Sequence, residues 1–86
     1  MMEQGIYSVY DSTVEAYMPI FLAANDGSAR RSFHANVNEP GSDIGRFPQD
    51  FVLMRVGTWN AQSGVIEPMV PKSLGVALEF VEKADA

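Results

Sequence analysis

The longest apolar run in the chain is the nine residues from Ala16 to Ala24, and Pro19 lies within it. A membrane-spanning helix needs about 20 apolar residues, so we expect no membrane span. Proline breaks a helix interior and cannot donate a hydrogen bond to a sheet. We therefore expect this run to form a strand at a sheet edge or bulge rather than a helix, with its bulky side chains buried on both faces.

Three other segments have the composition of strands. Residues 6–10 (IYSVY) are β-branched and aromatic, and residues 51–57 (FVLMRVG) form the clearest strand in the chain. Residues 65–68 are expected to return as a short partner of 51–57 after a hairpin loop at 60–64, in which Gly64 can adopt a positive φ. We expect Pro68 and Pro71 to end this strand.

Two segments have helical periodicity. Ala29, Phe33 and Val37 recur at i, i+4 and i+8 behind possible N-caps at residues 25–28, and residues 38–41 should end this helix. A polar loop is expected at 40–48, and a second amphipathic helix of about two turns at 73–81. The element order is then ββαββα. This order indicates an α+β fold with a mainly antiparallel sheet.

The length of 86 residues is enough for one domain, 1–86, and too short for two. Residues 83–86 are expected to be frayed. In a chain of this size the free energy of apolar burial roughly matches the opposing conformational entropy. Strands 6–10 and 65–68 are also candidates for unpaired edges, which another chain tends to cover. We therefore expect a homodimer or a larger homo-oligomer.

The residue types present argue against catalysis. The chain has no cysteine, which excludes thiolate metal sites, disulfides and a cysteine nucleophile. The single histidine, His34, has no Ser or Asp at a recognised catalytic spacing, and the glycines form no phosphate-binding loop. We expect no enzyme activity, no catalytic residues, no metal site and no cofactor.

The net charge is −5, but the basic residues are unevenly distributed along the chain. Four arginines lie in the middle third, whereas the two lysines are in an acidic C-terminal segment. Aromatic residues interleaved with cations are typical of proteins that bind single-stranded DNA, because bases stack on the rings and phosphates follow the cations. Burial in the core is the competing interpretation for the tyrosines. The candidate nucleic-acid-binding residues are Arg30, Arg31, Arg46, Arg55, Tyr7, Tyr10 and Trp59.

Four motifs together resemble a known family. They are I-Y-S-V-Y-D at 6–11, P-I-F…A-N-D-x-x-A-x-R-x-F at 19–33, F-P-x-D-F-x-L-x-x-x-G-x-W-N at 47–60 and S-G-V-I at 63–66. In order and spacing they resemble the small nonstructural protein of gokushovirus-type microviruses, which are single-stranded DNA phages. The likeness covers about residues 5 to 68 and leaves the expected C-terminal helix outside.

The resemblance implies a DNA-binding protein of the host bacterial cytoplasm. Its role would be in genome replication, or in the switch from duplex synthesis to single-strand production and packaging. Arg31 is the strongest candidate among the matching residues, because it has no evident structural role. The alternative is a regulator that binds the replication initiator, a capsid precursor or a host factor through its acidic C-terminal face. Arginines that lie on one surface with exposed aromatic side chains would favour the DNA-binding interpretation. Arginines in salt bridges with Asp11, Glu15 or Asp50 would favour the regulator.

Overall fold

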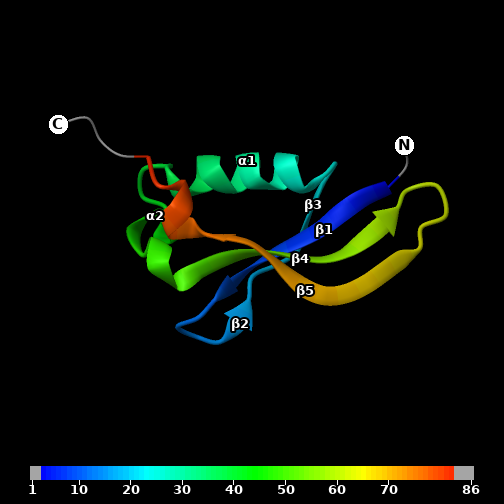
Figure 1. Cartoon of the computed structure of the whole chain (residues 1–86), viewed down its shortest axis with the longest axis horizontal. Coiled ribbons are helices and arrows are strands. Elements are labelled where there is room, and N and C mark those ends of the chain that lie inside the picture. Colours follow the sequence, from blue (N-terminus) through cyan, green and yellow to red (C-terminus); the bar gives the residue numbers. More distant parts are fainter. Residues whose placement is uncertain (1–2, 83–86) are drawn as a thin grey trace.

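The computed structural model describes residues 3–82 as a five-stranded sheet with helices against one face (Figure 1). All strand pairs are antiparallel, so the predicted α+β class with a mainly antiparallel sheet is confirmed. Within these residues no helix has the length and apolar character needed to cross a membrane. The elements are β1 (Glu3–Asp11), β2 (Ala16–Tyr17), β3 (Phe21–Ala23), α1 (Asp26–Val37), α2 (Asp43–Arg46), the 3-10 turn η1 (Pro48–Asp50), β4 (Phe51–Asn60), β5 (Ile66–Val76) and the 3-10 turn η2 (Ala77–Phe80).

The first strand is at the centre of the sheet. One side of β1 pairs with β4 along its whole length, and the other side pairs with β2 and then β3. The outer strand β5 pairs with β4. The prediction that 6–10 forms an unpaired edge is therefore wrong, and the edges are formed by β5 and by β2 with β3.

The run from residue 16 to 24 forms two short strands instead of one. Met18, Pro19 and Ile20 separate β2 from β3, because proline cannot donate a hydrogen bond to the sheet. The break is held against β1 by two hydrogen bonds: the Met18 amide donates to the Val9 carbonyl at 2.8 Å, and the Ser8 hydroxyl donates to the Met18 carbonyl at 2.6 Å. Most of the segment is exposed, so the expected burial on both faces is wrong.

The last strand is longer than predicted, and the expected helix at 73–81 is wrong. Strand β5 continues through Pro68 and Pro71 to Val76, and only the single turn η2 follows. Prolines are tolerated here because β5 is an edge strand, whose outward-facing amides have no partner strand. Gly75 adopts φ +141°, which no helix contains. Leu74 and Ala77 are nevertheless buried, which explains the apolar spacing.

The predicted apolar stripe of α1 is confirmed. Ala29, Phe33 and Val37 are all buried, and the Asn25 side chain caps the helix by accepting a hydrogen bond from the Ser28 amide at 2.8 Å. The predicted hairpin loop is also confirmed, with Gly64 at φ +78°. The core on this side of the sheet consists of Tyr7, Val9, Ala29, Phe33, Val37, Ile44, Phe51, Leu53, Leu74 and Ala77.

The predicted loop at 40–48 contains the short helix α2. Ser42 caps this helix, and Ile44 contributes to the core. Gly45 lies directly against the end of α1, because a Cβ at this position would collide with the Val37 carbonyl oxygen. The predicted fraying of residues 83–86 lies outside the described residues.

The two faces of the sheet differ. Because strand side chains alternate and paired residues share a face, the register assigns each strand residue to a side. The helix face carries Tyr7, Val9 and Leu53, which pack under α1. No helix covers the opposite side, the open face, within residues 3–82 (Figure 1). The register positions of the open face are Gln4, Ile6, Ser8, Tyr10, Tyr17, Leu22, Val52, Met54, Gly57, Trp59, Ile66, Pro68, Ser73 and Val76.

We predict that Gly45→Ala destabilises the fold by about 1–3 kcal/mol, since the added methyl must push α2 away from the backbone of α1. Gly27→Ala is the control, because a Cβ there approaches only the Asn25 side chain, at 3.3 Å. Urea unfolding of both variants measures the difference. Equal stability of Gly45→Ala and the wild type would contradict the close contact.

Candidate functional site

Asp26, the first residue of α1, joins the helix to three strands. Its Oδ1 accepts hydrogen bonds from the Tyr7 hydroxyl of β1 and from Arg55 Nη1 of β4, each at 2.8 Å. Its Oδ2 accepts one from Lys72 Nζ of β5 at 3.3 Å. We call these four residues the Asp26 cluster. They place two cations and a phenol around one carboxylate, where the N-terminus of α1 meets the sheet.

Local features of the sequence position each member of the cluster. The Asn25 cap places Asp26 in the first turn, where the helix dipole favours a negative charge. Gly5 gives space to the Tyr7 ring, because a Cβ at Gly5 would collide with the hydroxyl group. A bulge in β4 places Arg55 opposite Tyr7, with the guanidinium 5.6 Å from the ring centroid.

The cluster shifts the pKa values of its two acids in opposite directions. Burial alone raises the pKa of Asp26, but the hydrogen bonds from Tyr7, Arg55 and Lys72 outweigh burial and lower the pKa from 3.8 to about 2. Burial, followed by the hydrogen bond to the Asp26 anion, raises the pKa of Tyr7 from 10.0 to about 12. At neutral pH Asp26 is therefore ionised and Tyr7 is protonated.

Two further arginines of α1 extend the positive charge. Arg30 lies one turn after Asp26 and is exposed; its Nε donates to the Leu74 carbonyl at 3.5 Å. Arg31 is also exposed, on the side of the helix away from its buried stripe. We call Arg30, Arg31, Arg55 and Lys72 the basic region. With Asp26 included, its formal charge is +3 in a chain whose net charge is −5.

Arg46 lies away from the basic region. It ends α2, next to the C-terminal end of α1, about 10 Å along the helix from Arg30. Its guanidinium is 3.8 Å from Asp43 and 5.4 Å from the Phe47 ring centroid. Among residues 3–82 the carboxylates that pair with arginines are therefore Asp26 and Asp43, and not the Asp11, Glu15 or Asp50 that we considered from the sequence.

The predicted aromatic residues do not join the arginines. Tyr7 is 0% exposed, so the prediction that it offers a stacking surface is wrong. Tyr10 and Trp59 are partly exposed at open-face positions, on the other side of the sheet from α1. Tyr10 packs on Tyr17 with ring centroids 4.9 Å apart. The predicted set thus divides between the two sides of the sheet, with the cations near α1 and the accessible rings opposite.

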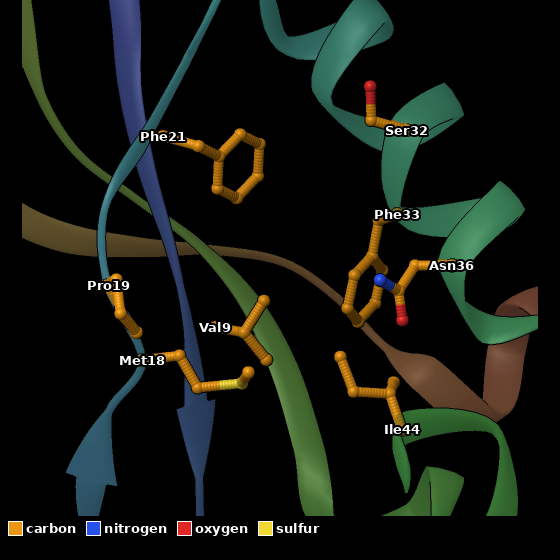
Figure 2. Close-up of a pocket in the computed structure, with 8 residues that line it drawn as sticks. All are labelled: Val9, Met18, Pro19, Phe21, Ser32, Phe33, Asn36 and Ile44. Atoms are coloured by element: carbon orange, nitrogen blue, oxygen red, sulfur yellow. The ribbon is translucent and has the colours of Figure 1, made fainter. Parts of the chain in front are cut away.

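A small pocket of about 230 Å³ opens between α1 and the segment that joins β2 to β3. Figure 2 shows the Phe21 and Phe33 rings pointing into it from opposite sides, with Ser32 and Asn36 on the helix. Pockets for small molecules usually measure about 300–1,000 Å³. The lining residues of this pocket are uncharged, so it offers a phosphate no cation.

Nothing in the sequence indicates that Asp26 and Lys72 act together. Asp26 stands among the residues expected to cap a helix, and Lys72 lies in an acidic C-terminal segment. Their hydrogen bond joins residues 46 positions apart, and Asp26 is 29 positions from Arg55. No local spacing rule reaches that far, so only the fold reveals the cluster.

Comparison with known proteins gives one result. A family model described as Phage ORF5 protein matches residues 4–80. No curated protein and no solved structure matches the chain. The match begins in β1 and ends in η2, so it includes the Asp26 cluster and extends beyond residue 68, where the resemblance found in the sequence ended.

We predict that Asp26→Asn lowers the free energy of unfolding by about 2 kcal/mol at pH 7. Because the pKa of Asp26 is lower in the folded state, its contribution is present above pH 3.8 and is lost as the pH falls towards 2. The difference between wild type and variant in urea unfolding should therefore shrink from pH 7 to pH 2.5.

Asp43→Asn is the matched control for this test. Asp43 also begins a helix after a capping residue, but its side chain is 82% exposed. We expect its replacement to change stability by less than about 0.5 kcal/mol. If both substitutions lowered the free energy of unfolding equally, interaction with the helix dipole alone would explain the contribution of Asp26.

We predict that Tyr7→Phe costs about 1.5 kcal/mol, because it removes a hydrogen bond to a charged group. The wild type should also lose stability as the pH rises from 10 through 12, since the raised pKa of Tyr7 favours the protonated phenol in the fold. The loss of stability between pH 10 and pH 12 should be smaller in Tyr7→Phe than in the wild type. Tyr10→Phe, at a partly exposed ring, is the control and should behave as the wild type in thermal unfolding from pH 9 to 12.

Proposed function

The chain belongs to the Phage ORF5 protein family, and we propose that it is a non-enzymatic accessory protein that binds single-stranded DNA. It would act in the host bacterial cytoplasm, during genome replication or the switch to single-strand production and packaging. The phage would be a gokushovirus-type microvirus, in agreement with the resemblance in the sequence. The basic region beside α1 is the observation that supports this proposal best.

The basic region has the charge that a phosphate backbone requires. Four of the five Lys and Arg residues among 3–82 belong to it, and Arg30 and Arg31 are exposed. Arg55 and Lys72 already neutralise Asp26, so the carboxylate does not repel an approaching strand. Guanidinium groups can bind phosphate oxygens with two hydrogen bonds or stack on a base. A single strand could therefore follow α1 across Arg30 and Arg31 towards Lys72.

The expected affinity is modest and depends on salt. Each phosphate neutralised on a single strand contributes about −0.7 to the slope of log K against log salt. Three contacts from the basic region would give a slope of about −2. The remaining surface is acidic, so the complex should form at low salt and weaken strongly at high salt. Weak, sequence-tolerant binding suits a protein that meets newly made single strands.

The Asp26 cluster is poorly suited to acid–base catalysis, and this supports a binding role for the surface that contains it. A general acid or base works best when its pKa lies near the working pH. In the Asp26 cluster the pKa values are about 2 for Asp26 and about 12 for Tyr7, both far from neutral. His34 lies 3.3 Å from Glu82 on the exposed surface, outside this cluster.

We predict that Arg31→Ala weakens binding of a fluorescent oligothymidine by about fivefold, or about 1 kcal/mol, and makes the salt slope shallower by about 0.7. Arg46→Ala is the matched control, because Arg46 is equally an exposed helical arginine but lies outside the basic region. Its affinity should remain within about twofold of the wild type. Fluorescence anisotropy over a salt titration measures both quantities.

Two outcomes would contradict the proposal. If the folded wild type does not bind the oligonucleotide at low salt, the single-strand function is excluded and the protein-binding regulator becomes the better hypothesis. If Arg31→Ala and Arg46→Ala weaken binding equally, the interaction is a general response to charge and not a property of the basic region.

A further inference from the structure

The open face of the sheet has no charged residue at any of its register positions. Five residues in the strands carry a charge, and the register places all of them on the helix face: Glu3, Asp11, Arg55, Glu67 and Lys72. The only ionisable groups on the open face are the phenols of Tyr10 and Tyr17. In a chain with 20% charged residues, this separation leaves the open face uncharged at every register position.

Apolar side chains on this surface remain accessible to solvent. Leu22, Tyr17 and Ile66 are 46%, 47% and 62% exposed. Ile6, at the centre of the open face, is buried but does not belong to the main core. The open face thus carries apolar side chains outside the main core, and no helix or strand within residues 3–82 packs over them.

The edges of the sheet are poor sites for adding another strand. Pro68 and Pro71 remove two amide donors from β5, and Pro19 interrupts the opposite edge between β2 and β3. Prolines at edges prevent strand addition from another chain. Because α1 packs over the core of the helix face and all five charged strand residues lie on that face, the open face is the uncharged part of the sheet that remains available for association.

We propose that the open face binds the open face of a second copy, forming a symmetric dimer. Each chain has a net charge of −5, and this face lets two copies meet without opposing like charges. A two-fold contact uses the same surface of both chains, and an uncharged surface is complementary to itself. The absence of cations argues against nucleic acid or an anionic membrane as the occupant.

The size of the face is sufficient for such a dimer. Four strand positions at about 4.8 Å and nine residues at about 3.3 Å give a footprint of about 600 Å² for each chain. The two footprints together bury about 1,200 Å², which is the lower limit for stable protein interfaces. In this dimer both α1 helices and both basic regions face outwards, so self-association does not cover the proposed DNA-binding surface.

The test is the solution mass of the full chain and of three variants. Sedimentation equilibrium over about a 100-fold range of micromolar concentrations should show a dimer of the 9.4 kDa chain. Leu22→Glu and Ile66→Glu each place two carboxylates in the interface and should weaken dimerisation by at least about 100-fold. Leu78→Glu is the matched control, since Leu78 is 57% exposed but lies in η2, outside the sheet.

Circular dichroism and thermal unfolding establish that each variant is folded, which we expect because all three replaced side chains are largely exposed. Leu78→Glu should dimerise as the wild type does. A wild type that stays monomeric throughout the range overturns the proposal and leaves the open face to a different partner. A dimer that survives both open-face substitutions also overturns it, because the contact must then lie elsewhere.

Discussion

The structure depends on the hydrogen bonds that Asp26 accepts from three strands. Apolar packing places α1 over the sheet, but Ala29, Phe33 and Val37 alone would tolerate small shifts of the helix along the strands. A carboxylate with three donors at fixed positions tolerates such shifts poorly, because each lost donor leaves a partly buried charge or phenol without a partner. Asp26 therefore fixes the position of α1 relative to β1, β4 and β5.

Local patterns predicted much of the fold. The stripe of α1, the strand at 51–57 and the glycine of the hairpin loop depend on neighbours within about one turn of helix or one pair of strands, and all three are present. The error at 73–81 arose because Leu74 and Ala77 have a spacing that suits a helix as well as the end of an edge strand. Whether a proline ends a strand or lies on a free edge depends on strand order, which the sequence does not reveal.

The candidate site was predicted less well, for a related reason. Arg31 is exposed on α1 as expected, whereas Arg55 donates most of its hydrogen bonds within the fold, to Asp26, Thr58 and Gly57. The sequence shows that both residues are cations but does not show which carboxylate lies near each of them. Likewise, alternation within β1 separates Tyr7 from Tyr10, but only the position of α1 decides which of the two rings is covered.

The pairing of β1 with β4 has a consequence for how the protein is made. Strands β4 and β5 meet across a short loop, whereas β1 pairs with residues that lie from 40 positions away (Asp11 with Phe51) to 57 positions away (Glu3 with Asn60). Closing such long loops costs entropy before any contact offsets it, and this slows folding. Because β1 is synthesised before β4, one whole side of it stays without a partner until residues 51–60 leave the ribosome. The central strand of the finished sheet is therefore an open edge of the growing chain, and the sheet cannot be completed before those residues have emerged.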